Sequence, residues 1–435
     1  MVAVLVWAWA LLPAAASVAQ PWTLQRAIQQ AFAANPDARL AQHRIEAAQA
    51  ELQQANSAFW PHLQLQSSYT RTDNPMLVFG SILNQRAFSP SLNFNDVPDV
   101  DDMNVRGVLM QPLYAGGRIS AGRQAAKANT AAARADAQAV RNNLAFEVAR
   151  TFHTVLKTRQ FIQAAEAGVR SFETNLDIAR RRVAAGTALK TDVLDMEVRL
   201  AQAREDLVRA RNANALSERA LRTILGIPAT DDGPFTVADS APEVSAPSGN
   251  DFSTRPELRA LSEKERAAQA AVRQARAGYR PGVSAFGRLD YDYGWRTEGD
   301  GKSYTAGLMA QWDIWDGKLT RGRVREARAN VDAVREQERK LRLGIELEVE
   351  QARLQLEDAT QRLAVTKAAV AEARESAQLT RARFAQGLML STQLIDADTA
   401  LIAARVRRAQ AEADKAIAIA ALRKALGLPQ LTTMQ

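Results

Sequence analysis

The chain has no cysteine among its 435 residues. This absence excludes disulfides, zinc ribbons, thiol catalysis and attachment of a lipid to an N-terminal cysteine. Only three histidines are present, and their wide spacing leaves little for a metal site or a Ser-His-Asp triad. We therefore expect no enzyme: no catalytic residue, no cofactor and no metal site.

Aromatic residues are scarce at 6%, and there are only 22 glycines and 15 prolines. An Ala-, Arg-, Gln- and Glu-rich chain of this kind is typical of long helices. The net charge is +8, but 56 basic and 48 acidic residues are interleaved along the chain. Because the basic residues do not cluster, we expect no nucleic-acid partner.

The long apolar run at the start is the one strong targeting signal. Val2 to Leu12 is uninterrupted, and the small residues Ser17 and Ala19 suit cleavage before Gln20. This predicts a signal peptide over 1–19, although no Lys or Arg precedes the apolar run. A buried helix end or a membrane anchor is the alternative, but the run is too short to span a hydrocarbon core of about 30 Å as a helix. No later run of eighteen apolar residues exists, so we expect no transmembrane helix after it.

The sequence contains an internal duplication. Five short motifs recur in the same order at a spacing of about 200 to 220 residues, which is the signature of internal duplication. The clearest are Gln111–Arg118 with Gln311–Lys318, Arg182–Gly186 with Arg383–Gly387, and Leu221–Pro228 with Leu422–Pro429. We predict a first structural repeat over 20–225 and a second over 255–429. A linker over 226–254, rich in Pro, Gly, Ser, Asp and Ala, joins them, and 430–435 is a tail.

Each repeat reads as helix, strand pair, very long helix, turn and return helix. The predicted ranges are strands within 61–114, helix 117–185 and helix 190–225, then strands within 281–315, helix 318–385 and helix 391–426. Seventy residues of helix extend about 100 Å. Gly186 and Gly387 supply the stops. The small apolar residues drift between helix faces, which predicts a tube of helices packed on two flanks rather than a two-stranded coiled coil.

The strand segments alternate between apolar and polar residues. Val283 to Tyr293 and Tyr304 to Ile314 alternate clearly, as do Leu63 to Tyr69, whereas Asn104 to Tyr114 is less regular. Between the first pair lies an expected loop that carries Asp99, Asp101 and Asp102. Such strands are typical of outer-membrane barrels, and a water-exposed hairpin is the alternative. Four aromatic residues near the strand ends suit a membrane interface: Trp60, Tyr114, Trp312 and Trp315.

Four strands cannot close a barrel. Open edges in lipid leave backbone groups unpaired at several kcal/mol each, and the smallest transmembrane barrels have about eight strands. The chain must therefore assemble in outer-membrane lipid. Three copies, a homotrimer, supply twelve strands and a twelve-helix tube.

This doubled plan resembles the TolC family of outer-membrane efflux proteins from about Thr23 to Pro429. The resemblance rests on the order of the motifs, on Gln111–Gly117, and on the turn motifs Gly186…Asp195 and Gly387…Ala397. It implies a mainly α fold whose long antiparallel helices form an α-barrel, with four strands given to a trimeric twelve-stranded β-barrel. It also implies a tunnel across the periplasm that docks with a periplasmic adaptor and an inner-membrane transporter of the RND or ABC type.

The resemblance also implies a gate where the helices turn. Its candidate residues are Asp396, Gln393, Asp192 and Asp195, and the turns at Gly186 and Gly387 are the expected adaptor-docking region. Family partners of the Asp192 position, a Tyr and an Arg, are replaced by Phe384 and Met389, which predicts a looser gate or a different tether. Alternatively, Asp396 and Asp398 are solvated residues in the first turn of the final helix.

The predicted function is a passive exit duct of a tripartite efflux system for drugs or other small molecules. Type I protein secretion and heavy-metal efflux remain alternatives, because selectivity resides in the pump. A periplasmic or surface coiled-coil structural protein without a pore is the alternative of a different class.

Overall fold

The computed structural model describes residues 21–93, 95–228, 230, 235–242 and 244–431. The predicted signal peptide and the end of the tail lie outside the described residues. The chain divides into two compact units. The helical unit comprises Met1–Leu40, Ala139–Thr254 and Ile345–Gln435, and the sheet unit comprises Ala41–Gln138 and Arg255–Gly344. Each unit therefore draws segments from both sequence repeats.

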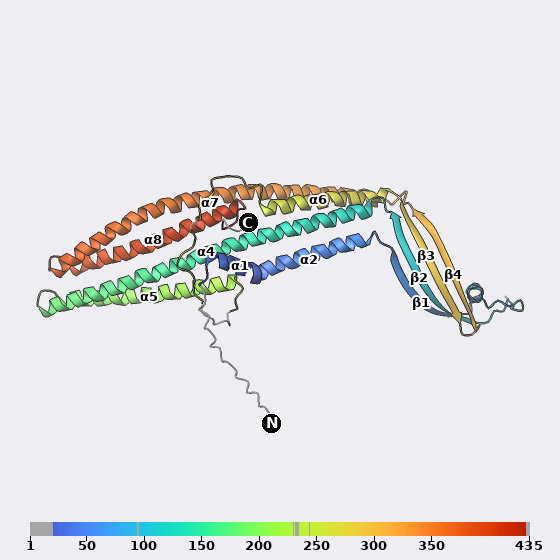
Figure 1. Cartoon of the computed structure of the whole chain (residues 1–435), viewed down its shortest axis with the longest axis horizontal. Helices are drawn as coiled ribbons and strands as arrows, with labels where there is room; N and C mark the ends of the chain where they lie inside the picture. The colour runs from blue at the N-terminus through green and yellow to red at the C-terminus, as the bar shows by residue number, and fades with distance from the viewer. Residues whose placement is uncertain (1–20, 94, 229, 231–234, 243, 432–435) are drawn as a thin grey trace, which may run out of the picture. The chain divides into compact units, whose positions relative to one another are not determined.

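Long helices dominate the fold and follow the duplication (Figure 1). Apart from the short α3 (Pro75–Asn84), the α-helices of the first repeat are α1 (Leu24–Ala34), α2 (Pro36–Ser57), α4 (Arg118–Ala184) and α5 (Lys190–Ile224). Those of the second are α6 (Pro256–Arg276), α7 (Leu319–Ala385) and α8 (Ser391–Ala425). Helices α4 and α7 both have 67 residues, and α5 and α8 both have 35. The mainly helical fold is as predicted.

Within the described part of the chain, none of the helices is both long enough and apolar enough to cross a membrane.

Glycine ends the long helices where the sequence predicts. Gly186 follows α4 with φ of +73°, and Gly387 follows α7 with φ of +82°. This left-handed conformation is the one that glycine adopts without steric cost at a helix C-terminus. The chain then reverses into α5 and α8, so each repeat contains an antiparallel helix pair.

The main core of the helical unit joins α1, α4 and α5. Ile28, Val148, Phe152 and Leu221 are fully buried within it. Val237, from the segment between the repeats, is also buried there, and its neighbour Thr236 accepts a backbone hydrogen bond from Trp22 at 2.7 Å. The segment predicted as a linker thus packs against the helices through part of its length.

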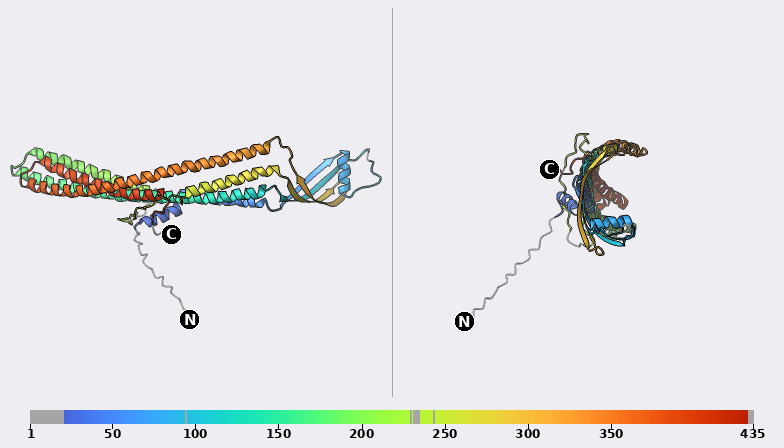
Figure 2. Two further views of the ribbon diagram at one scale, coloured as in Figure 1. Left: turned by 90° about the horizontal axis from the view of Figure 1, so that it is seen from above. Right: turned by 90° about the vertical axis from the view of Figure 1, so that its right-hand side faces the viewer.

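The sheet unit contains one antiparallel sheet in the order β1-β2-β3-β4, labelled in Figure 1. Figure 2 shows the same strands from two further directions. Its strands are β1 (His62–Thr72), β2 (Val100–Tyr114), β3 (Gly282–Gly294) and β4 (Gly299–Gln311). The central pair, β2 and β3, joins the two repeats. Among the described residues, β1 and β4 each pair with one strand only, so the sheet has two open edges.

The two faces of the sheet differ in polarity, as the alternation predicts. On one face Arg106 lies opposite Asp290, with 2.5 Å between Nε and Oδ1, and Asn104 Nδ2 donates to Asp292 Oδ1 at 2.8 Å. The other face carries large apolar side chains that are 68% to 80% exposed: Leu63, Leu65, Leu289, Tyr304 and Leu308. An exposed apolar face opposite a polar one is the pattern of a barrel wall between lipid and water.

Two details of the strands differ from the prediction. Strand β2 begins at Val100 rather than Asn104, so Asp101 and Asp102 belong to the strand and not to an acidic loop. Their charges are accommodated because Arg296 N donates to Asp101 and Gln85 donates to Asp102. Strand β4 ends at Gln311, so the predicted alternation through Ile314 was wrong over its last residues.

A helix stands where the sequence suggested only a loop. Helix α3 (Pro75–Asn84) lies in the β1–β2 connection. It forms because Asn74 caps it, with Oδ1 accepting from Met76 N at 3.1 Å, and because a proline is favoured in the first helical position. Val78 and Ile82 bury against Val100, so docking onto the sheet stabilises a helix whose uniform apolar composition gives no helical period.

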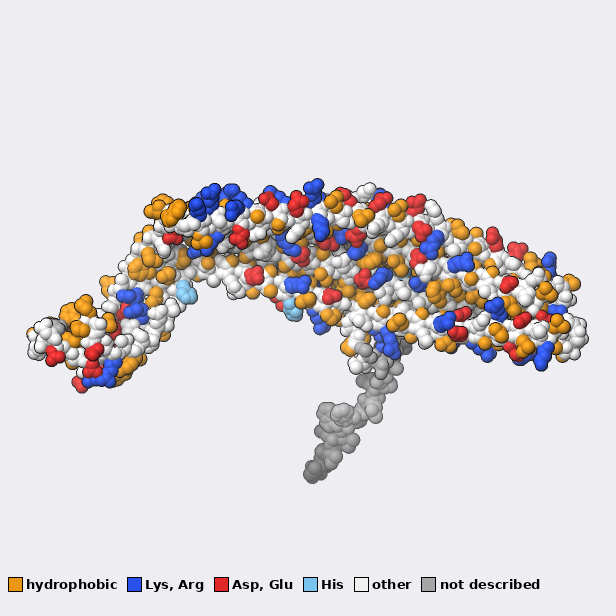
Figure 3. All heavy atoms as spheres, turned by 180° about the vertical axis from the view of Figure 1, so that it is seen from behind, with side chains coloured by type: hydrophobic (Ala, Val, Ile, Leu, Met, Phe, Trp, Pro, Cys, Tyr) orange, Lys and Arg blue, Asp and Glu red, His pale blue; other side chains and the backbone are white. Residues whose placement is uncertain are grey.

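The surface charges are mixed. On the face that Figure 3 shows, acidic and basic side chains are interspersed and no large area of one sign stands out. Many of them form ion pairs between neighbouring helical turns, such as Arg342 with Glu338 and Arg408 with Glu412. This distribution agrees with the expectation from the interleaved sequence.

Candidate functional site

The candidate site is the end of the helical unit where α4 turns into α5 and α7 turns into α8. A buried apolar cluster joins the four helices there: Phe172, Leu176, Ala179, Met196, Leu200, Ala203, Phe384, Leu394 and Ile395. Phe384 is only 1% exposed. Burial of aromatic and aliphatic side chains from both repeats holds the two turns together.

Two of the predicted gate residues cap helices. Asp192 is the third residue of α5, and its Oδ2 accepts a hydrogen bond from Leu189 N at 3.0 Å. Gln393 is the third residue of α8, and its Oε1 accepts from Leu390 N at 3.2 Å. Each side chain satisfies a backbone N–H that the first turn leaves without a helical partner. The two residues therefore hold equivalent positions in the two repeats.

The turns contact each other directly. Ser391 Oγ donates to Asp192 Oδ1 at 2.6 Å, which links α8 to α5. Arg182 of α4 donates to the carbonyl of Phe384 at 3.1 Å, and its guanidinium lies 4.8 Å from the centre of that ring. Asp192 thus has a side-chain partner from the second repeat.

The other two predicted gate residues lie one turn further along the helices. Asp195 is the sixth residue of α5 and Asp396 the sixth of α8, and both are exposed. The first turn of α8 carries no acidic residue, so the interpretation of Asp396 as a first-turn residue was wrong. The four candidates form two matching pairs, one on each return helix.

Asp398 is buried rather than solvated, so the alternative interpretation of this residue was also wrong. It is 1% exposed and lies two residues beyond Asp396. Its Oδ2 accepts from Asn175 Nδ2 at 2.5 Å and from Ser171 Oγ at 2.9 Å, and its Oδ1 accepts from Arg381 Nη2 at 2.8 Å. Burying a carboxylate is costly unless it is hydrogen-bonded and paired in this way.

This Asp398 cluster, formed by Ser171, Asn175, Arg381 and Asp398, connects α4, α7 and α8. Sequence reasoning missed it because its members are separated by as many as 227 positions. The one local signal is that Ser171 and Asn175 lie four residues apart and so share a face of α4. That spacing alone does not identify a partner on another helix.

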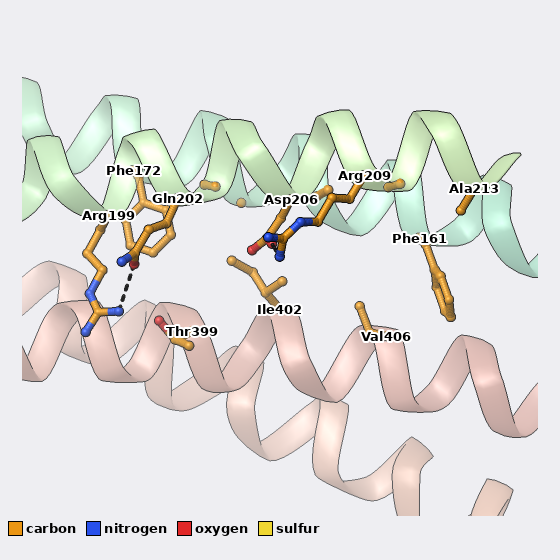
Figure 4. A pocket seen from close by; sticks show the side chains of 14 residues that line it. Phe161, Phe172, Arg199, Gln202, Asp206, Arg209, Ala213, Thr399, Ile402 and Val406 are labelled. Atoms are coloured by element: carbon orange, nitrogen blue, oxygen red, sulfur yellow. Dashed lines mark hydrogen bonds and ion pairs between the residues drawn. The ribbon is translucent and has the colours of Figure 1, made fainter. Parts of the chain in front are cut away.

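A groove separates α5 from α8 near these turns (Figure 4). It has a volume of about 450 Å³, and Phe161, Phe172, Ile402 and Val406 provide apolar lining. Arg199 Nη1 donates to Gln202 Oε1 at 3.0 Å along one wall. The return helices are therefore packed less tightly here than at the turns.

The four predicted interface aromatics gather at one end of the sheet. Trp60 precedes β1, Tyr114 ends β2, and Trp312 and Trp315 follow β4. Since the strands are antiparallel, the start of β1 and the ends of β2 and β4 lie at the same end of the sheet. All four are exposed, between 47% and 78%, and Trp312 Nε1 donates to the carbonyl of Tyr279 at 3.2 Å.

Comparison with known families decides the identity. The sequence matches the outer membrane efflux protein family over residues 27–227 and 252–428, which is most of the chain. The chain belongs to the outer membrane efflux protein family. No curated relative matches it in sequence. The family assignment makes this efflux protein an outer-membrane channel and not an enzyme.

Solved channel structures share the fold. The outer-membrane channel OprN is 22% identical with a TM-score of 0.78, and the match covers 93% of this chain and 89% of that one. The CmeC channel of Campylobacter jejuni is 18% identical with a TM-score of 0.80, covering 94% and 86%. The VceC protein of Vibrio cholerae is 18% identical with a TM-score of 0.77, covering 94% and 97%. At this identity the likeness concerns the fold alone.

Proposed function

We propose that this efflux protein is the passive exit duct of a tripartite efflux system for small molecules. The duct is a homotrimer whose β-barrel sits in outer-membrane lipid and whose helices form a tunnel in the periplasm. A periplasmic adaptor binds the tunnel, and an inner-membrane transporter of the RND or ABC type supplies the energy.

The observation that carries the proposal is the four-stranded sheet, which has two open edges and one exposed apolar face. Unpaired N–H and C=O groups in hydrocarbon cost several kcal/mol each. Three copies close the edges by pairing β4 of one with β1 of the next. Twelve tilted strands leave a water-filled interior on the polar face that carries Arg106 and Asp290.

The gate lies at the helix turns. Exposed Asp396 and Asp195 provide carboxylates that, repeated three times around an axis, attract cations at the tunnel entrance. Asp192 and Gln393 cap the return helices and hold the turns in shape. The contact between Ser391 and Asp192 serves as the tether in place of the missing tyrosine and arginine. The adaptor docks at the turns around Gly186 and Gly387.

The four strand-end aromatics mark the membrane interface on the periplasmic side. Tryptophan and tyrosine favour the headgroup level because one part of the ring is apolar and another forms hydrogen bonds. Trp60, Tyr114, Trp312 and Trp315 therefore fix the depth of the barrel in lipid.

The cargo follows from the pump that the duct serves. A system for type I secretion or for heavy metals would use the same kind of tunnel. The cargo is therefore tested by expressing the duct together with its adaptor and its pump. Restoring drug resistance in a strain that lacks its own duct, together with adaptor and pump genes found beside this one, supports small-molecule efflux. Restoration of protein export or metal resistance alone would assign one of the other cargoes.

The duct itself is tested with the purified protein. We expect light scattering in detergent to give three times the mass of one mature chain, and heating to shift the gel mobility. Planar bilayers should show discrete conducting steps. A folded monomer that never conducts would contradict the proposal and favour a coiled-coil structural protein.

Neutralising Asp396 tests the gate. Asp396→Asn should lower the cation-over-anion permeability ratio by about twofold or more, because a ring of three charges is removed. Asp332→Asn is the matched control, since Asp332 is exposed on α7 in the sheet unit and forms only a surface ion pair with Arg335. Equal ratios in the two variants would place the selective ring elsewhere.

A further inference from the structure

Helix α3 is anchored on the polar face of the sheet. Val100, against which Val78 and Ile82 pack, lies on the same side of β2 as Asn104 and Arg106, because alternate residues of a strand share a face. The short blue helix beside the strand ends in Figure 1 is α3. In the proposed barrel this polar face lines the water-filled interior, so α3 lies at the inner side of one mouth.

The segment after α3 is fixed to the β3–β4 turn by a buried glutamine. Gln85 is fully buried, and its Nε2 donates to the carbonyl of Asp101 at 2.7 Å and to Asp102 Oδ1 at 2.9 Å. Its Oε1 accepts from Thr297 Oγ1 at 2.5 Å. The hydrogen bonds of one side chain therefore tie the β1–β2 connection to both neighbouring parts of the sheet.

Three glycines make room for this contact. A Cβ at Gly301 would overlap the carbonyl of Asn84, and one at Gly294 or Gly299 would overlap atoms of Gln85. All three glycines lie on the polar face, since Gly301 pairs with Asp292, and Gly294, two residues beyond Asp292, pairs with Gly299. Since the docked segment depends on the absence of side chains there, α3 has a defined position and is not a loosely attached loop.

The side of α3 that faces away from the sheet is apolar. Met76 is 79% exposed, Leu77 56% and Leu83 46%. Gly80 lies between them, and a Cβ there would meet nothing within 4 Å. Glycine inside a helix is unfavourable relative to alanine, and packing against the described residues of this chain does not require it. A small residue in an apolar stripe allows a second helix to approach closely.

The dimensions of a twelve-stranded barrel bring the apolar sides of the three α3 helices together. Strands about 4.8 Å apart and tilted by about 40° close into a barrel of about 24 Å backbone diameter. A helix with its side chains is about 10–12 Å wide. Three helices fixed to the inner face of such a mouth cannot avoid one another, and their apolar sides point toward the axis.

We propose that the three α3 helices of the trimer meet through Met76, Leu77, Gly80 and Leu83 and form an apolar constriction at the outer mouth of the duct. The occupant of each exposed α3 face is thus α3 of a second copy of this chain. An apolar constriction resists water and ions by dewetting until it is widened. The duct therefore has a second barrier, at the end of the barrel away from the strand-end tryptophans. This inference rests on the proposed trimeric pore.

Cysteine cross-linking tests the contact, and the chain contains no natural cysteine that would interfere. Gly80→Cys and Met76→Cys are made in the full chain, with Ser91→Cys as the control in an exposed part of the same connection. Mild oxidation of the purified trimer should produce covalent dimers from Gly80→Cys or Met76→Cys. Three equivalent thiols allow only one pair, so one chain in each trimer stays unlinked. A trimer that conducts but yields no more dimer than Ser91→Cys overturns the inference.

Conductance tests the barrier. Leu77→Asp should raise single-channel conductance by about twofold or more, because a charged ring hydrates the constriction. Ser91→Asp adds the same charge to the same connection away from α3 and should conduct like the unaltered protein. Equal effects of the two variants, or none, would contradict the constriction. If the unaltered protein forms neither trimers nor pores, the proposed function fails first, and the two failures are thereby distinguished.

Discussion

At the scale of single residues, Asp398 links three long helices of the helical unit. Its carboxylate is buried and has three partners on two other helices. Removing one member of a buried charged pair leaves the other without compensation, which costs about 3–5 kcal/mol when both are buried. Arg381 is partly exposed, at 36% of its side chain, so solvent reduces that cost.

We expect Asp398→Asn to destabilise the unit by about 1–3 kcal/mol and to loosen the turns. The result should be a lower unfolding temperature and more frequent opening in bilayers. Arg381→Gln made in the Asp398→Asn variant should cause little further loss of stability, because the ion pair is already broken. Strictly additive losses from the two substitutions would show that the pair does not act as a unit.

His153 makes the stability of the helical unit depend on pH. Burial lowers the pKa of His153 to about 4 from 6.5. Below pH 6.5 the unfolded chain therefore binds a proton that the folded chain excludes, and stability falls as the pH falls toward 4. Between pH 7 and pH 5 the loss is about 2 kcal/mol.

Replacing the imidazole should remove that part of the dependence. His153→Gln, followed by denaturant unfolding at pH 7 and pH 5, should show a smaller difference between the two conditions than the unaltered chain. His43→Gln is the control, since His43 is exposed on α2. An undiminished pH effect in His153→Gln would assign it to other groups.

At the scale of elements, docking of α3 depends on a steric gap at Gly301. Gly301→Ala places a methyl group against the carbonyl of Asn84 and should release the segment from the sheet. Trypsin should then cut after exposed Arg86 about tenfold faster, since about 1.4 kcal/mol of lost docking energy raises the open population by that factor. Gly287→Ala is the control, because a Cβ at Gly287 meets nothing within 4 Å. Similar cleavage in both variants would indicate a general weakening of the sheet.

Elements with local sequence signals could be predicted, whereas those stabilised by distant contacts could not. Two kinds of local signal were sufficient. The glycines that end the helices, Gly186 and Gly387, predicted the long helices, and the alternation of apolar and polar residues predicted the two faces of the strands. Helix α3 carries a local start signal in Asn74 and Pro75, but the apolar run from Pro75 to Asn84 has no helical period. The contact with Val100 that stabilises the helix does not show in the sequence. Burial of Asp398 likewise arises from helices more than 200 positions apart.

At the scale of the whole molecule, the open edges decide whether the chain can exist alone in lipid. In an antiparallel strand, the N–H groups of adjacent residues point to opposite sides. Of Thr305 and Ala306 in the edge strand β4, one therefore donates toward β3 and the other toward the open edge. Proline removes the donor at either position.

The two proline variants separate folding from assembly. The variant that loses the edge donor should keep its sheet, seen by circular dichroism, but form trimers at a yield about tenfold lower, as one interstrand contact per interface is lost in a setting where unpaired groups cost several kcal/mol. The variant that loses the bond to β3 should lose sheet signal as well. Light scattering measures the trimer fraction. If both variants assemble fully, β4 is not the strand through which neighbouring copies join, and the closed twelve-stranded wall is contradicted, because closure needs both open edges of the sheet.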